Sequence, residues 1–134
     1  MKFSPEFIHK NVPIKHLVTF NIGGNADFSY ANIGKLIKLR TINGKANFRR
    51  ANIGNMCNLQ NINGTANFSY ATIPSLNSLI YIGGHALFSH ARISSAPMLE
   101  FVEGNVVLQA SPLRKKLQNK DLHLKTYIRH LFVD

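Results

Sequence analysis

The sequence lacks several features that would point directly to a compartment or a covalent framework. It has one cysteine, Cys57, in 134 residues, which excludes an internal disulfide framework and a zinc cage of several cysteines. It also has no apolar run of about eighteen residues and no apolar stretch at its start, so we expect neither a membrane span nor a secretory signal. We therefore predict a cytoplasmic protein.

Catalytic motifs are missing as well. The chain has no G-x-S-x-G, no glycine-rich phosphate loop and no H-E-x-x-H motif. His123 and His130 stand seven residues apart but have no further metal-ligating side chains of suitable type nearby. We predict a protein that is not an enzyme and that uses no metal or cofactor.

Acidic residues are scarce, with six Asp and Glu against sixteen Lys and Arg, and the formal net charge is +10. Such a charge favours an anionic partner, which could be a nucleic acid, an acidic protein or a membrane surface. A soluble surface that is merely basic is the other interpretation.

What the sequence does contain is a repeat of twenty residues. Glycine recurs at Gly24, Gly44, Gly64, Gly84 and Gly104. Counted from each of the first four glycines, alanine lies two and seven positions later, phenylalanine four and isoleucine nine; the phenylalanines are Phe28, Phe48, Phe68 and Phe88. The second half of each block spaces its large apolar residues by three, as in Leu36, Leu39 and Ile42. This regularity predicts a stacked solenoid of about four to five coils, within a single domain over residues 1–134 whose repeats cover 17–110.

The two halves of each repeat predict different backbones. In the first half, apolar and polar residues alternate, which is the pattern of a strand that buries Ala26 and Phe28 and exposes Asn25, Asp27 and Ser29. The period of three in the second half suits a 3₁₀ or an extended return across the far side of the coil. We expect the four phenylalanines to stack on one another inside the solenoid.

Both ends of the chain depart from the repeat and predict caps. Ser4-Pro5-Glu6 is typical of a helix start, so residues 1–16 are expected to form an N-terminal cap with a short helix over about 5–10. Leu17, Phe20 and Ile22 resemble half a coil whose register is shifted by one residue. Ser111-Pro112 and the apolar spacing after it predict a C-terminal helical cap over 111–134 with a cationic outer surface.

The motif A-x-F-x-x-A-x-I, preceded by L-x-x-L-x-x-I, resembles the leucine-rich repeat, whose core is L-x-x-L-x-L-x-x-N/C-x-L. Four alanines stand where that family has Asn or Cys: Ala31, Ala51, Ala71 and Ala91. The segment 26–35 also looks like two units of a pentapeptide repeat, but the next two units place polar residues at their central positions. We favour a leucine-rich-repeat-like coil with one parallel sheet. The resemblance implies a protein that binds other proteins through its strand face.

Equivalent positions of successive repeats should form rows along such a solenoid, because neighbouring strands lie about 4.8 Å apart. The most distinctive row follows each strand and consists of Tyr30, Arg50, Tyr70 and His90. With three residues beside it, this row gives the predicted binding site: Tyr30, Lys45, Arg49, Arg50, Tyr70, His85 and His90.

Tyr and Arg are enriched in binding hot spots, so we predict a protein partner. Alternating aromatic and cationic groups also suit bases and phosphates, which makes nucleic acid the alternative. The tyrosines could instead simply cover the edge of the core. A homodimer joined through the ends of the solenoid is also possible, because terminal coils expose strand edges.

Overall fold

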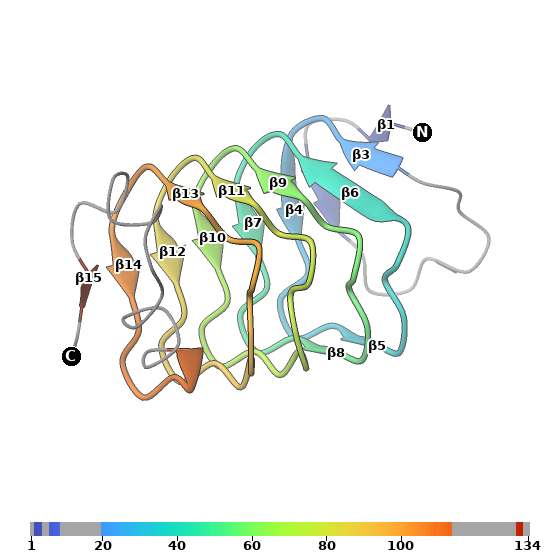
Figure 1. Ribbon diagram of the computed structural model, residues 1–134. Helices are drawn as coiled ribbons and strands as arrows, with labels where there is room; N and C mark the ends of the chain where they lie inside the picture. Colours follow the sequence, from blue (N-terminus) through green and yellow to red (C-terminus); the bar gives the residue numbers. More distant parts are fainter. Residues whose placement is uncertain (1, 4–5, 9–19, 114–130, 133–134) are drawn as a thin grey trace.

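The computed structural model describes residues 2–3, 6–8, 20–113 and 131–132 (Figure 1). In this part of the chain, strands of successive coils pair in parallel, and residues twenty positions apart face one another, as Ala26 and Ala46 do. The chain is therefore a parallel β-solenoid whose coil is twenty residues long, as the repeat predicts.

One side of the solenoid is sheet A, a parallel sheet of six strands. Its order is β1 (Lys2–Phe3), β3 (Phe20–Ile22), β6 (Leu39–Ile42), β9 (Asn61–Ile62), β11 (Tyr81–Ile82) and β13 (Phe101–Val102). The pairing of β3 with β6 shifts register by one residue between Phe20 and Asn21, which confirms the predicted offset of the first half-coil.

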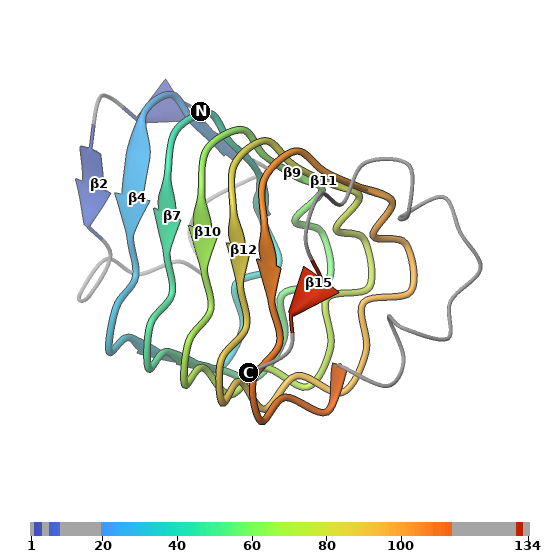
Figure 2. The same cartoon turned by 90° about the vertical axis from the view of Figure 1, so that its left-hand side faces the viewer.

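A second side is sheet B, a parallel sheet of seven strands (Figure 2). Its order is β15 (Leu131–Phe132), β14 (Val106–Val107), β12 (Ala86–Leu87), β10 (Ala66–Asn67), β7 (Ala46–Asn47), β4 (Asn25–Asp27) and β2 (Glu6–Ile8). A third sheet, sheet C, pairs β5 (Asn32–Ile33) with β8 (Asn52–Ile53), and isolated bridges continue it through Thr72 to Arg92. The expectation of one parallel sheet is wrong, because each coil extends its backbone on more than one side.

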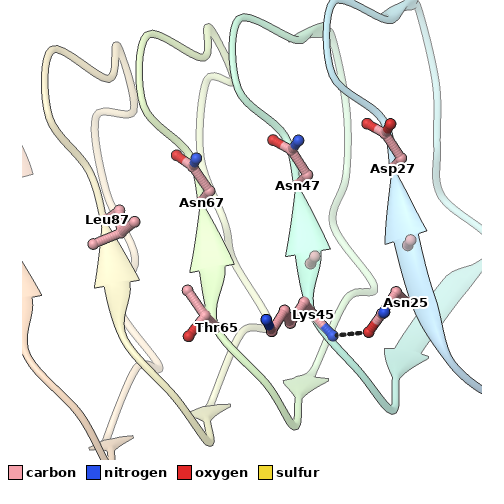
Figure 3. A pocket seen from close by; sticks show the side chains of 9 residues that line it. Asn25, Asp27, Lys45, Asn47, Thr65, Asn67 and Leu87 are labelled. Atoms are coloured by element: carbon pink, nitrogen blue, oxygen red, sulfur yellow. Dashed lines mark hydrogen bonds between the residues drawn. The ribbon is translucent and has the colours of Figure 1, made fainter.

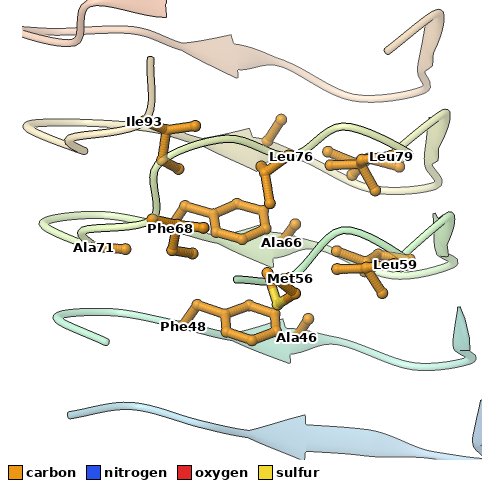
Figure 4. Packing of buried hydrophobic residues seen from close by; sticks show 14 of the residues in the cluster. Ala46, Phe48, Met56, Leu59, Ala66, Phe68, Ala71, Leu76, Leu79 and Ile93 are labelled. Carbon is orange, nitrogen blue, oxygen red and sulfur yellow. The ribbon is translucent and has the colours of Figure 1, made fainter. Parts of the chain in front are cut away.

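The core is a column of stacked phenylalanines. The rings of Phe28, Phe48, Phe68 and Phe88 are fully buried, with centroids 5.1, 5.0 and 5.4 Å apart and planes inclined by no more than 4°. Figure 4 shows two of them, Phe48 and Phe68. Their spacing matches the distance between strands, so each coil contributes one ring to the column. The predicted superposition of these rings is confirmed.

The second half of each coil fills the rest of the interior. Leu36, Leu39 and Ile42 are fully buried. Leu59 and Leu79 occupy the place of Leu39 in the next two coils and are also buried (Figure 4). Ile42 lies in a strand of sheet A, so the backbone there is extended. Of the two conformations that a period of three suits, the extended one occurs at this point.

Glycine recurs because successive coils approach closely. A Cβ added to Gly64 would lie 2.8 Å from both the carbonyl carbon and the oxygen of Gly44, and Gly84 and Gly104 meet the backbone of the preceding coil in the same way. No glycine among the described residues has a positive φ. The glycines are therefore required by the space between coils and not by a left-handed turn.

Residues 2–3, 6–8 and 131–132 of the predicted caps are strands, whereas residues 111–113 are not. Residues 6–8 form β2, which pairs with β4 so that Glu6 faces Asn25, and Leu131–Phe132 form β15, which pairs with β14. The helices predicted at residues 6–8 and 131–132 are wrong, because these residues are extended and pair with neighbouring strands of sheet B. Most of the predicted C-terminal helix, residues 114–130, lies outside the described residues. Among the described residues, no helix has the length and hydropathy needed to cross a membrane.

Candidate binding site

Each coil leaves sheet B through a tight corner that presents the predicted row. The Ala31 N–H donates to the Phe28 carbonyl at 3.0 Å, and the same bond closes the corners of the next three coils, also at 3.0 Å. The third residue of each turn is left-handed, with φ of 62° at Tyr30, 60° at Arg50, 61° at Tyr70 and 55° at His90. These four side chains are exposed at equivalent corners, so the predicted row exists.

Polar side chains on the strands hold these corners in place. The Asn47 Oδ1 accepts a hydrogen bond from the Arg49 N–H at 3.0 Å, and Asn67 accepts one from the Ser69 N–H at 2.9 Å. Asp27 accepts from both the N–H and the hydroxyl of Ser29, at 3.0 and 2.6 Å. This is the local turn that Asp and Asn favour, and it fixes the residue that precedes the left-handed corner in the first three coils, whereas the fourth coil has Leu87 at the acceptor position.

A left-handed residue with a side chain costs roughly 1–2 kcal/mol, and glycine would avoid most of that cost. Glycine occurs elsewhere in every coil, yet these corners hold tyrosine, arginine and histidine, and Ala110 occupies the next one with a φ of 54°. Such strain often accompanies function. These corners are therefore a candidate contact surface.

Tyr70 stacks with cationic and aromatic neighbours from adjacent coils. The His90 ring lies 4.8 Å from the Tyr70 ring and is inclined by 9°, and the Arg50 guanidinium carbon lies 4.5 Å from the same ring. The Arg49 guanidinium carbon is 5.2 Å from it. Because Arg50 comes from the preceding coil and His90 from the following one, they cover opposite faces of Tyr70.

A pocket of about 450 Å³ opens beside this stack, and we call it the corner pocket. Its lining residues are Arg50, Tyr70, Thr72, His90, Ala91, Arg92, Ala110 and Pro112. Thr72 and Arg92 were not among the predicted site residues. They lie two residues beyond Tyr70 and His90 and are joined by a bridge of sheet C, so the corner turns their side chains back toward the row. The sequence does carry a signal that could have identified Thr72 and Arg92. Eight residues after each repeat glycine stands a polar row, which consists of Asn32, Asn52, Thr72 and Arg92.

None of the described residues that line the corner pocket is acidic. Asp27 lies on the face of sheet B, and Glu103 accepts a hydrogen bond from the Tyr81 hydroxyl at 3.4 Å beside sheet A. Partial burial, and then the negative charge and hydrogen bond of Glu103, raise the pKa of Tyr81 above its ordinary value. No described side chain in the lining therefore offsets the positive charges of Arg50 and Arg92.

The outer face of sheet B carries a second hollow, which we call the strand-face groove. It encloses about 360 Å³ and is lined by two polar rows, one with Asn25, Lys45 and Thr65 and one with Asp27, Asn47 and Asn67, where Leu87 ends the second row (Figure 3). The first row links the coils: the Lys45 N–H donates to the Asn25 Oδ1 at 2.8 Å, and the Asn105 N–H donates to the His85 Nδ1 at 2.9 Å.

The structure thus divides the seven predicted residues between two places. Arg49, Arg50, Tyr70 and His90 form one contact group, and Tyr30 occupies the first corner of the same row with 66% of its surface exposed. Lys45 and His85 lie five residues before the corners of their coils, on the order of 15 Å away along the strand. His85 contacts the backbone of the next coil, so it has a place in the fold irrespective of any partner.

Comparison with models of known protein families, with curated proteins and with solved structures gives no significant match to this chain. Similarity therefore establishes neither the leucine-rich-repeat resemblance nor the pentapeptide-repeat one. What is established is the parallel β-solenoid with its twenty-residue coils.

Proposed function

We propose that this protein is a non-catalytic binding scaffold that contacts another protein through the row of corner residues and the adjoining corner pocket. The observation that carries the proposal is the placement of Tyr70 between Arg50 and His90 on left-handed corners. Aromatic and arginine side chains held in one arrangement lose little conformational entropy when a partner binds, and these residue types supply most interface hot spots.

The leucine-rich-repeat-like sequence pattern supports the same class of function. That family mostly binds proteins through the face of its parallel sheet, and in this chain sheet B leads directly into the corners. The strand-face groove lies on the same sheet and would extend the contact surface. A partner that covers both the corner pocket and the strand-face groove would touch five coils and bury the polar rows together with the aromatic stack.

Nucleic acid is the second candidate, and the net charge of +10 favours it. Stacking of bases on tyrosine is the usual means of holding a single strand. Tyr70 does not offer this easily, because Arg50 and His90 already cover its two faces. The protein partner is therefore our first proposal.

The test is affinity capture from the native host at moderate salt, identification of the captured macromolecule, and direct binding measurement with the purified partner. The variant Arg49→Glu/Arg50→Glu should lose at least about tenfold in affinity, because it reverses two charges in the contact group. The matched control is Lys38→Glu/Arg40→Glu, which changes the net charge equally on another side of the coil.

Equal loss in both variants would show that only net charge matters and would contradict a site at the corners. A captured nucleic acid, released by nuclease and by rising salt, would support the second candidate instead. Circular dichroism on each variant checks that the fold is intact.

A further inference from the structure

We propose that the corner pocket binds a phosphate-class oxyanion presented by the partner as a phosphorylated side chain. This inference rests on the proposed function in one respect, namely that the partner is a protein. The oxyanion site itself depends only on the chemistry of the pocket.

The lining of the corner pocket offers hydrogen-bond donors of the kind that bind phosphate. The lining residues that carry donor groups are Arg50, Arg92, His90, Tyr70 and Thr72. Among the described residues, no acidic side chain pairs with either arginine. Arginine binds phosphate through paired, charge-assisted N–H bonds, and clusters of it are the usual receptors of phosphorylated side chains.

The two arginines line the same pocket from different coils. Arg50 and Arg92 belong to coils two apart, which separates them by roughly 10 Å along the solenoid axis. Between them lie the Tyr70 and His90 rings, whose stacking fixes this wall of the pocket at a 4.8 Å separation. The Arg50 guanidinium is held 4.5 Å from the Tyr70 ring, so its position is set before a ligand arrives.

Within the described residues, the charges at the corners form a single site and not a continuous track. In the first coil, the equivalents of Arg50 and Arg92 are Tyr30 and Asn32, neither of which is a basic residue. A polyanion lying along the corners would meet cations over only part of its length. A volume of about 450 Å³ is within the range of small-molecule sites and has room for one phosphorylated side chain. These features favour a phosphorylated protein segment over a nucleic-acid strand.

The first experiment measures binding of phenyl phosphate by calorimetry and by histidine ring signals in NMR spectra, at constant ionic strength set with chloride. Arg92→Gln should weaken binding at least about tenfold, because it removes a charge-assisted hydrogen bond. Arg50→Gln should act in the same direction, and the matched control Arg40→Gln, on sheet A, should bind as the wild type does. Benzoate should bind more weakly than phenyl phosphate, because it has one charge and two oxygens.

Unchanged binding in both Arg92→Gln and Arg50→Gln, or an equal loss in Arg40→Gln, would overturn the oxyanion site. The second experiment treats the captured partner with phosphatase. A tenfold or greater loss of affinity for the wild type, but not for Arg92→Gln, would support a phosphorylated partner.

If phenyl phosphate binds but phosphatase has no effect on the captured protein, the oxyanion site stands and the phosphorylated partner is overturned. If a short single-stranded oligonucleotide displaces phenyl phosphate at lower concentration than a phosphopeptide does, nucleic acid replaces protein as the source of the phosphate. If Arg49→Glu/Arg50→Glu leaves partner capture unchanged while Arg92→Gln abolishes phenyl phosphate binding, the proposed function fails and the oxyanion site remains.

Discussion

At the scale of single residues, each coil contains two positions at which the local structure restricts the type of residue. One is the glycine at the bend between sheets A and B, where the neighbouring coil leaves no space for a Cβ. The other is the left-handed corner, where the backbone would prefer glycine and the first four coils have tyrosine, arginine or histidine instead. Sequence periodicity identified both positions, but it could not tell which of the two needed a positive φ, since glycine satisfies either demand.

Gly64→Ala tests the first of these demands. The added Cβ would lie 2.8 Å from the carbonyl carbon of Gly44, which is backbone and cannot move aside cheaply, so we expect the free energy of unfolding to fall by roughly 1–3 kcal/mol. Gly34→Ala is the matched control, because a Cβ there meets nothing within 4 Å and the φ of Gly34 is not positive. That change should be neutral or stabilise by up to about 1 kcal/mol. Urea denaturation of both variants measures the difference, and equal effects would contradict the close-approach explanation.

At the scale of elements, the strands are short and depend on the aromatic column that they enclose. Strands β7, β10 and β12 have two residues each, so their few hydrogen bonds cannot order a coil unless the interior is filled. The Phe68 ring stacks on both Phe48 and Phe88 and is fully buried. A change at Phe68 therefore acts on three coils at once.

Phe68→Ala should lower the free energy of unfolding by about 3–5 kcal/mol, because it removes buried surface and leaves a cavity between two rings. Tyr30→Ala is the control, since it truncates an aromatic side chain that is 66% exposed and should change stability by no more than about 0.5 kcal/mol. Thermal unfolding followed by circular dichroism gives both values. A loss of less than 1 kcal/mol at Phe68 would mean that the column is not what holds the coils together.

The elements that could be predicted from the sequence were those whose pattern repeats. The alternation around Phe28 predicted a strand with one buried face, and the row from Tyr30 to His90 followed from the repeat length. Two things could not be read in this way. The helix signal at Ser4-Pro5-Glu6 is local, and residues 6–8 instead pair with β4 along the edge of sheet B. Arg92 occupies a polar row that the repeat does show, but the row alone does not indicate that it lines the same pocket as the corner residues.

At the scale of the whole molecule, the net charge of +10 opposes the compact state at low ionic strength. Raising NaCl from about 0.01 M to about 0.15 M shortens the Debye length from about 30 Å to about 8 Å, which screens most of this repulsion. We expect the midpoint of thermal unfolding to rise by a few degrees, equivalent to roughly 1 kcal/mol. The variant Lys38→Glu/Arg40→Glu carries less charge and should show a smaller rise, and a midpoint that falls with salt would mean that attractive ion pairs outweigh the repulsion.

The same titration separates general screening from occupation of the corner pocket. Sodium phosphate at matched ionic strength should raise the midpoint further than NaCl does, because a ligand that binds only the folded state stabilises it in proportion to the logarithm of its concentration. Arg92→Gln should lose this additional rise and keep the response to NaCl, since it empties the pocket of one cation and barely alters the total charge. If wild type and Arg92→Gln respond alike to both salts, the stabilisation is a general effect of the salts, through screening of charge and exclusion of phosphate from the surface, and the corner pocket contributes no site of its own.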